Sequence, residues 1–406
     1  MTEQEHNNVQ WRKVRFDQFF DMLPTNTLSR DKLNNQQGEY QNIHYGDVLI
    51  KYPFCLDCNN AEIPYINDGV KFNMAEVRDG DVIFADTAED DTVGKCVEVL
   101  NVGDRKIVSG LHTYFCRPRH EMALGYLGYY LNSNHFHNQL LPYIAGSKVS
   151  SVNRTSIART FISYPADLSA QRRIASILAS ADKVIAATQK TIAKYKQIKQ
   201  GMMEELFNEQ CTMNNVQWRK VRLGEVIDDS YAGGTPNRSR SDYFGGDIPW
   251  VSSGEVNNPE IHSTIENITI EGLNNSSAKW IPENSILVAL YGATAGQVSM
   301  LRIKATSNQA VLAVIPNAEI ADTKFLFYQI VYNKDNLLYL AQGSGQPNLS
   351  KNLVDRLEIS IPDLSEQRRI ASILSGIDGK IAAEEKVLEK YEKVKKGLME
   401  RMLNEQ

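Results

Sequence analysis

The sequence predicts an α+β protein: two similar globular domains and two long helices packed as an antiparallel coiled coil, with a pseudo-twofold internal repeat. Two repeats lead to this prediction. The string NNVQWRKVR at residues 7–15 is repeated unchanged at residues 214–222. Residues 168–210 are similar to residues 364–406 and align with them without a gap. The blocks between them, residues 16–161 and 223–358, mostly differ in sequence. Repeated segments that flank two blocks of different sequence indicate two different domains held by a symmetric pair of helices.

The predicted domains follow from these repeats. We expect a first domain at residues 1–161, a first helix and linker at 162–213, a second domain at 214–358 and a second helix at 359–406. Short β-rich runs such as DVIFA and SILVALYG alternate with Gly and Asn turns in the two blocks. Three parallels suggest that the blocks share one fold: residues 63–66 with 248–251, 82–85 with 286–289, and 92–95 with 294–297.

The long repeat predicts two helices of about forty residues, or roughly 60 Å each. Apolar residues recur at alternating steps of three and four, which is the pattern of a coiled-coil seam. Ser169 and Ser365 are the expected N-caps. Antiparallel packing would place the blocks at opposite ends, whereas parallel packing would place both at one end; we favour antiparallel. The predicted interface residues are Leu178, Ile185, Ile192, Tyr195, Met202, Leu374, Ile381, Leu388, Tyr391 and Leu398.

Bulk composition narrows the class of protein. With 406 residues, 42% hydrophobic and 23% charged, the chain can bury at least two cores. The polar N-terminus and short apolar runs predict a cytoplasmic protein without a secretory signal or membrane span. Five cysteines favour reduced thiols over a disulfide framework. Because the net charge is −5, any surface for nucleic acid must be a local patch.

Several strings carry a resemblance to a known family. They are GGTP at 233–236, IPW at 248–250, GATAG at 292–296, NQA at 308–310 and IPDLSEQ at 361–367. With the two repeats, these strings make the chain resemble the specificity subunit of type I restriction-modification systems over essentially its whole length. The first block lacks the GGTP and GATAG strings, so its assignment depends on its position and on the shared tail.

The resemblance implies a protein without catalytic activity of its own. Each domain would recognise one half of a bipartite site on double-stranded DNA, and the helices would fix the gap. Two modification subunits carrying S-adenosylmethionine would dock on the helices, and restriction subunits could join them. Unlike domains imply an asymmetric, interrupted site. The alternative is a coiled-coil scaffold whose variable domains bind protein or another ligand.

The sequence also lacks several catalytic signatures. It contains no Pro-Pro pair of the kind found in amino-methyltransferase loops, no phosphate loop and no HExxH pair. Cys55 and Cys58 form a CxxC, but no second pair at zinc spacing follows, so reduced thiols are the expected state and no metal is predicted. The acidic run at residues 89–91 is expected to be a solvated loop.

Eight polar side chains are candidate DNA contacts, because they lie in turns or loops where guanidinium, ammonium and amide groups can reach phosphates or base edges. For each, an ordinary exposed side chain is the competing interpretation. They are Lys95, Lys148, Arg154, Arg238, Arg240, Gln297, Gln346 and Lys351. Three aromatics are candidates for stacking on bases or, alternatively, for closing the core: Tyr231, Trp250 and Tyr291. The duplicated arginines at the helix starts are candidates for structural or partner contacts: Arg172, Arg173, Arg368 and Arg369.

Overall fold

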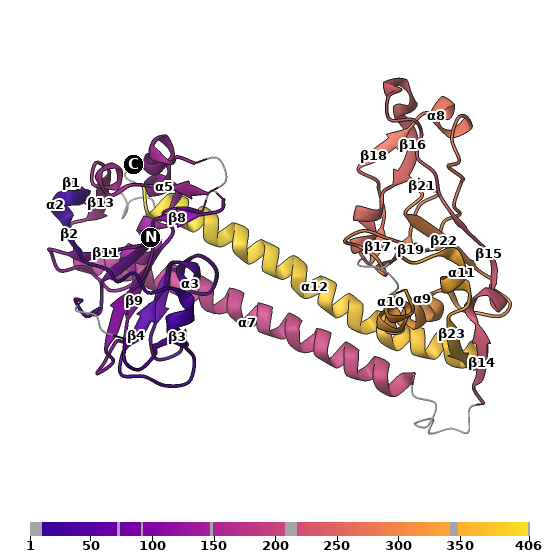
Figure 1. The fold of residues 1–406 in the computed structure, drawn as a ribbon, viewed down its shortest axis with the longest axis horizontal. Coiled ribbons are helices and arrows are strands. Elements are labelled where there is room, and N and C mark those ends of the chain that lie inside the picture. The colour runs from indigo at the N-terminus through magenta and orange to yellow at the C-terminus, as the bar shows by residue number, and fades with distance from the viewer. Residues whose placement is uncertain are drawn as a thin grey trace. The chain divides into compact units, whose positions relative to one another are not determined.

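The computed structural model describes residues 10–70, 74–90, 92–146, 149–207, 217–341 and 348–404. The chain forms two compact units. Unit 1 comprises residues 1–189 and 386–406, and unit 2 comprises residues 190–385. Each unit therefore combines one globular domain with the first part of the helix that follows it and the last part of the other helix (Figure 1). Among the described residues, no helix is long and apolar enough to cross a membrane.

The domain of unit 1 is built on a five-stranded sheet. Its strand order is β2-β11-β7-β9-β5, antiparallel except for the last pair, which is parallel. The bounds are β2 Phe20–Leu23, β5 Cys55–Asp57, β7 Val82–Ala85, β9 Cys96–Leu100 and β11 Thr113–Pro118. All four residues of β7 are buried, as expected of a central strand covered on both faces.

The domain of unit 2 has the same sheet. Its order is β15-β22-β19-β20-β17, again antiparallel with a parallel final pair. The bounds are β15 Ile227–Ala232, β17 Glu260–Ile261, β19 Ile286–Ala289, β20 Val298–Leu301 and β22 Val311–Pro316. Strands β7 and β19 hold the same place, and in both domains the following TxG[KQ] turn has a glycine with positive φ, Gly94 and Gly296. These two predicted parallels are confirmed.

The predicted parallel between residues 63–66 and 248–251 was wrong. Strand β4 (Gln41–Ile43) runs parallel to β10 (Ile107–Ser109), just as β16 (Phe244–Val251) runs parallel to β21 (Thr306–Ser307). The counterpart of residues 248–251 is therefore β4. Residues 65–66 form β6, which pairs antiparallel with β4 and with β3 (Leu33–Asn34). The shared Ile-Pro string misled because it lies after β5 in one domain and before β17 in the other.

The remaining elements surround these sheets. In unit 1 they include β8 Thr87–Ala88, β12 Ser150–Ser151, α2 Phe16–Phe19, α3 Tyr45–Ile50, α4 Tyr126–Leu131, α5 Asn134–Leu140 and α6 Arg154–Ile157. In unit 2 they include β18 Glu266–Ile268, α8 Ile270–Asn274, α9 Thr323–Tyr332, α10 Lys334–Leu340 and α11 Lys351–Asp355. Helix pairs α4/α5 and α9/α10 follow the last sheet strand in each domain, which extends the repeat beyond the sheets.

The short repeat has a structural role in both domains. Its WRKVR string forms β1 (Trp11–Arg15), which pairs antiparallel with β13 (Phe161–Pro165). In the second domain RKVR forms β14 (Arg219–Arg222), which pairs antiparallel with β23 (Glu358–Ile361). Strands β13 and β23 lead directly into the long helices. The repeated string therefore ties each domain to the start of its helix.

The long helices are α7 (Leu168–Leu206) and α12 (Leu364–Met402), each of 39 residues. The expected N-caps were wrong, because Ser169 and Ser365 lie within the first turn. The carboxylate of Asp167 accepts hydrogen bonds from the Ser169 and Ala170 amides at 3.1 and 3.3 Å, and Asp363 accepts one from Glu366 N at 2.9 Å. An aspartate can accept amide hydrogen bonds and also carries the charge favoured at this end of a helix.

A buried glutamine fixes each helix start to its domain. The side chain of Gln171 accepts from Ala123 N at 2.9 Å and donates to Pro165 O at 2.8 Å. The equivalent Gln367 accepts from Asp322 N at 2.8 Å and donates to Pro362 O at 2.9 Å. Both side chains are almost fully buried, so these bonds satisfy groups that water cannot reach.

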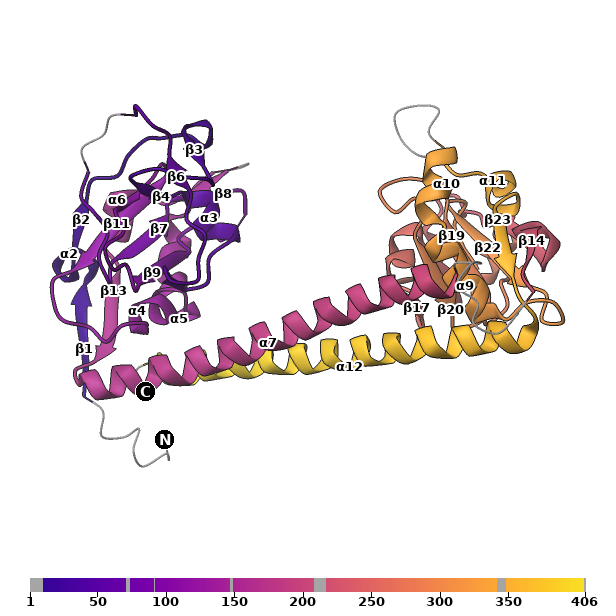
Figure 2. The same ribbon diagram turned by 90° about the horizontal axis from the view of Figure 1, so that it is seen from below.

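Within each unit the helix segments pair antiparallel. In unit 1, Leu178 near the start of α7 shares a core with Met402 at the end of α12. In unit 2, Met203 near the end of α7 shares a core with Leu374 near the start of α12. Figure 2 shows these two helix segments side by side. Nine of the ten predicted interface residues are buried or half-buried: Leu178, Ile185, Ile192, Tyr195, Met202, Leu374, Ile381, Leu388 and Leu398. Tyr391 is 40% exposed.

A buried glutamate anchors the start of helix α4 in the unit 1 domain. Both carboxylate oxygens of Glu98, on β9, accept backbone hydrogen bonds, from Gly125 N at 2.8 Å and Gly128 N at 2.7 Å. Burial raises the pKa of Glu98 to about 7. In the strand register of unit 2 its counterpart is Met300, and there the side chain of Asp322 caps α9 instead. A carboxylate thus serves the same helix end in both domains but comes from different elements.

Candidate DNA interface

Arg238 lies on the second domain but is held by its neighbours. Its guanidinium forms a paired hydrogen bond with Glu266 at 2.6 and 2.9 Å and stacks over Phe244 and Trp250, with its carbon 4.4 and 5.0 Å from the ring centroids. The side chain is still 55% exposed. Contact with a phosphate or guanine would require it to exchange or share the Glu266 carboxylate.

Arg240 and Lys351 are also paired within the second domain. Arg240 forms a paired hydrogen bond with Asp242 at 2.8 and 2.6 Å, and Lys351 contacts Asp355 at 2.6 Å. Both cations remain about half exposed. The two aspartates lie two and four residues further along the chain, so the sequence itself indicates that the charges of Arg240 and Lys351 are compensated. The Arg238 partner, 28 residues away, had no such signal.

The first-domain candidates have different surroundings. The ammonium of Lys95 donates to Leu49 O at 2.7 Å, and its burial lowers the pKa of Lys95. Arg154 is exposed and donates to Met22 O at 3.0 Å, beside a hollow of about 230 Å³. Gln297, at the turn equivalent to Lys95, is half-buried. Lys148 and Gln346 lie outside the described residues.

A patch of lysines and aromatics on the second domain was missed in the sequence. The ammonium of Lys304 lies 4.6 Å from the ring centroid of Trp280, and that of Lys279 lies 5.5 Å from the ring of Tyr231. The Tyr231 hydroxyl donates to Trp280 O at 2.6 Å, which joins the two pairs. We call these four residues the Lys–aromatic patch. Neither lysine forms an ion pair with any residue that the structure describes, so both charges are available to a polyanion.

The three aromatic candidates divide between core and surface. Trp250 is 2% exposed, and its indole N–H donates to Gly234 O at 2.9 Å, so it belongs to the core. Tyr231 is half-buried in the Lys–aromatic patch, and Tyr291 is 36% exposed.

The GGTP string shapes the backbone beside the patch. A Cβ on Gly233 would lie 2.1 Å from Ser307 O, and one on Gly234 would lie 2.2 Å from Ser277 Oγ. Both positions therefore admit only glycine without movement of the neighbouring backbone. The chain passes closely over β21 and over Ser277 and Ala278, which lead directly to Lys279. These glycines thus have a packing role next to the patch rather than a contact role in it.

The cysteines and acidic residues form no metal site in the described parts of the chain. No group of three or more His, Cys, Asp or Glu side chains there is placed to hold an ion. Cys55, Cys58, Cys96 and Cys116 are free thiols, and burial raises the pKa of Cys58 to about 11. Asp90 accepts a hydrogen bond from Thr92 N at 2.9 Å within its own turn.

The duplicated arginines differ in their contacts. Arg369 pairs with Glu366 through two hydrogen bonds of 2.6 and 2.5 Å, one turn away on the same helix. Arg172 and Arg368 are exposed near the helix starts. The carboxylate of Glu366 satisfies one arginine of the second copy, and the first copy has alanine at that position.

Known proteins share both sequence and fold with this chain. The family model described as the type I restriction modification DNA specificity domain matches residues 215–393. The putative type I restriction enzyme MjaX specificity subunit of Methanocaldococcus jannaschii is 26% identical over 360 residues, covering 84% of this chain and 82% of that protein. The EcoR124I/EcoR124II specificity subunit of Escherichia coli is 31% identical over 169 residues, covering 40% of this chain and 41% of that protein.

Two solved structures have the same fold. The S subunit of a type I restriction-modification system from M. genitalium has a TM-score of 0.60 at 16% identity, covering 98% of each chain. A chain from a study of complex assembly in the type I R-M system has a TM-score of 0.60 at 18% identity, covering 98% of this chain and 99% of that one. Residues 215–393 thus belong to the type I restriction modification DNA specificity domain family, and the predicted resemblance of the chain to type I specificity subunits is confirmed.

Proposed function

We propose that this chain is the sequence-reading subunit of a type I restriction-modification complex, with each globular domain recognising one half of a bipartite site on duplex DNA. The observation that carries the proposal is one sheet topology occurring twice, in two blocks whose sequences mostly differ. Lys95 and Gln297, for example, occupy equivalent turns of the two domains. A shared fold supports the same mode of binding, while different side chains support different half-sites.

The helices connect the two readers and set the gap between half-sites. Their segments pair antiparallel within each unit, which supports an arrangement with one domain toward each end of the helical pair. Half-sites one turn of duplex apart have centres about 34–36 Å apart. A helix of this length, roughly 60 Å, is long enough to span that distance.

The chemistry of methylation belongs to partner chains. Two modification subunits bind the helices and supply S-adenosylmethionine, restriction subunits join that assembly, and this chain contributes no catalytic residue. An exposed apolar stripe on α12 supports docking there: Val387, Tyr391 and Val394 are 38, 40 and 53% exposed and lie at steps of four and three residues. The absence of a Pro-Pro pair from the sequence agrees with a methyltransferase centre on another chain.

A binding experiment separates this function from that of a protein-binding scaffold. The chain with its modification subunits is incubated with a library of random duplexes, and bound molecules are sequenced after several rounds. We expect enrichment of two unlike half-sites at a fixed gap. Binding without enrichment of any sequence would favour the scaffold and contradict sequence reading.

The Lys–aromatic patch leads to a specific prediction. Replacing Lys279 and Lys304 together by alanine should weaken DNA binding about 10- to 30-fold at 0.15 M salt, because each phosphate contact contributes counterion release. The slope of log affinity against log salt should become shallower by about 2, and the selected sequence should stay the same. Gel shifts at several salt concentrations measure both quantities.

A matched control removes two lysines elsewhere. Lys13 on β1 and Lys324 on α9 are exposed and lie on the domains rather than on the long helices, so the double alanine variant changes the net charge equally. This control should retain the original salt slope. Equal slopes in both double variants would show that the patch does not contact phosphate.

A further inference from the structure

The same three-residue contact occurs in both units where a domain meets the helices. In unit 1, the Tyr129 hydroxyl on α4 donates to Asp182 Oδ2 on α7 at 2.7 Å, and Lys395 Nζ on α12 contacts Asp182 Oδ1 at 2.5 Å. In unit 2, Tyr328 on α9 donates to Asp378 on α12 at 2.6 Å, and Lys199 on α7 contacts Asp378 at 2.7 Å. We call each Tyr–Asp–Lys set a junction triad.

Each junction triad joins three separate elements. The tyrosine comes from the globular domain, the aspartate from the helix that follows it, and the lysine from the end of the other helix. The lysine also lies over the tyrosine ring, 5.6 Å from the centroid in unit 1 and 5.2 Å in unit 2. A single carboxylate therefore receives one bond from the domain and one from the second helix. A tilt of the domain against the helix pair would strain these bonds.

The triads are partly shielded from water. Lys395 and Lys199 are 18 and 21% exposed, and their aspartates are 32 and 35% exposed. Charge-assisted bonds in such surroundings are stronger than those of fully exposed ion pairs. The blocks that carry the tyrosines mostly differ in sequence, yet this contact is the same in both.

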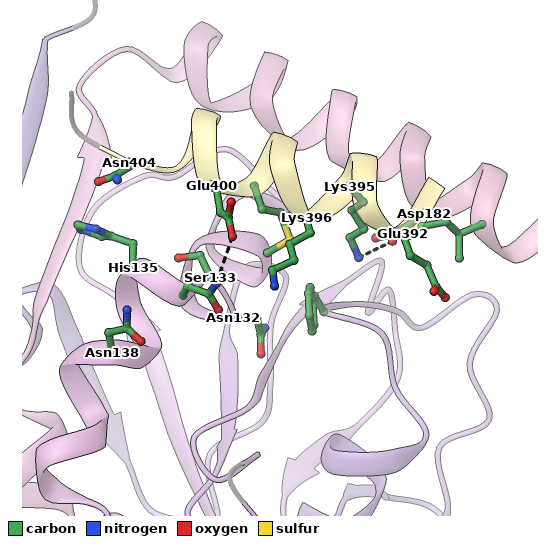
Figure 3. Close-up of a pocket in the computed structure, with 14 residues that line it drawn as sticks. Asn132, Ser133, His135, Asn138, Asp182, Glu392, Lys395, Lys396, Glu400 and Asn404 are labelled. Atoms are coloured by element: carbon green, nitrogen blue, oxygen red, sulfur yellow. Dashed lines mark hydrogen bonds and ion pairs between the residues drawn. The ribbon is translucent and has the colours of Figure 1, made fainter. Parts of the chain in front are cut away.

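Each triad lies where the packed contact between helix and domain gives way to an open hollow, since Tyr129 and Tyr328 also belong to the cores that the domains share with the helices. In unit 1, Asp182 and Lys395 line a hollow of about 600 Å³ between α12 and the polar ends of α4 and α5 (Figure 3). Figure 3 shows the Lys395–Asp182 pair on one side of this hollow and Asn132, Ser133 and His135 facing it from the domain. In unit 2, Asp378 and Tyr328 line a hollow of about 530 Å³.

The start of each following helix packs into the domain core, with Leu178 in unit 1 and Leu374 in unit 2, and this packing fixes where the helix joins the domain. Beside the hollows, the directional bonds of the triad add a constraint on the angle.

We propose that the junction triads are positioning elements that set the angle of each recognition domain on the helix pair and thereby select the gap between half-sites. This inference rests on the proposed function. A domain free to tilt would still present the same side chains to its half-site. It would, however, accept half-sites displaced by a base pair along the duplex.

The test maps methylated sites in a host that expresses the chain with its modification subunits. The variants are the double Tyr129→Phe, Tyr328→Phe protein and the double Lys199→Met, Lys395→Met protein. Both keep the apolar part of each side chain and remove the bonds. We expect the same two half-sites, with selectivity for the original gap over gaps one base pair longer or shorter reduced about tenfold, because bonds to charged groups are strong.

The controls keep this result interpretable. Tyr339→Phe removes a hydroxyl from a tyrosine that is 73% exposed, and it should leave gap selectivity unchanged. Original selectivity in both double variants would overturn the proposal. Complete loss of methylation by variants that remain folded would overturn it too, since a positioning bond should alter the gap and not recognition. If the unaltered protein directs no bipartite methylation, the proposed function itself fails, which is a separate outcome.

Discussion

The stability of unit 1 should fall by about 3 kcal/mol between pH 4.5 and pH 7 through Glu98 alone. Burial raises the pKa of this carboxyl to about 7, from an ordinary value of 4.5. A raised folded-state pKa means that the stabilising contribution is complete below pH 4.5 and is lost as the pH rises through 7. Each pKa unit corresponds to 1.36 kcal/mol, which gives about 3 kcal/mol at pH 7.

The measurement is the free energy of unfolding of the full chain in urea at several pH values, compared with Glu98→Gln. The variant cannot ionise, so the difference between the two proteins isolates this group. One hydrogen bond to Gly125 N or Gly128 N is retained by the amide oxygen. Glu121→Gln, at an exposed position of the same unit, is the control and should show no such difference in pH dependence. A pH-independent difference for Glu98→Gln would show that the carboxyl ionises normally in the folded protein.

Heptad spacing and the internal repeats predicted much of the fold. Heptad spacing is visible within one segment, and a repeat is visible when the sequence is compared with itself. The repeated string forms the same kind of strand pair in both domains, because β1 pairs with β13 and β14 pairs with β23. The equivalence of β7 in the first domain and β19 in the second, each followed by a glycine turn, was also predicted from the sequence. The Ile-Pro comparison failed because two short strings matched in letters while their order relative to β5 and β17 differed. Strand order depends on long-range pairing, which a single sequence does not show.

The candidate site was less predictable for a related reason. Sequence identifies which residues carry charge, but only the fold shows which charges are already compensated. Arg238, in a turn after β15, is paired with Glu266 on β18, whereas Lys279 and Lys304 are brought beside Tyr231 and Trp280 from separate segments. The junction triads could not be predicted, because Lys199 and Lys395 lie at seam positions of the heptad repeat and nothing in that repeat indicates a tyrosine partner on the globular domain.

Lengthening both helices should change the gap that the protein accepts. Insertions after residues 189 and 385 fall between the two compact units and occupy equivalent points of the repeat, so each unit keeps its own contacts. Four added residues lengthen each helix by about 6 Å, close to two base-pair steps, but also rotate it by roughly 40° beyond one full turn. We expect the preferred gap to grow by one or two base pairs, or binding to be lost where the rotation turns one domain away from the groove.

Seven added residues separate length from rotation. A full heptad keeps the apolar seam in register and adds about 10 Å, with only about 20° of residual rotation. If the helices set the gap, this variant should bind the original half-sites about three base pairs further apart, and selection from random duplexes will measure the shift. An unchanged gap in the seven-residue variant would mean that the half-site spacing is fixed elsewhere, on the modification subunits or by the DNA. Recognition of the half-sites by the two domains would then stand while the helical ruler would not.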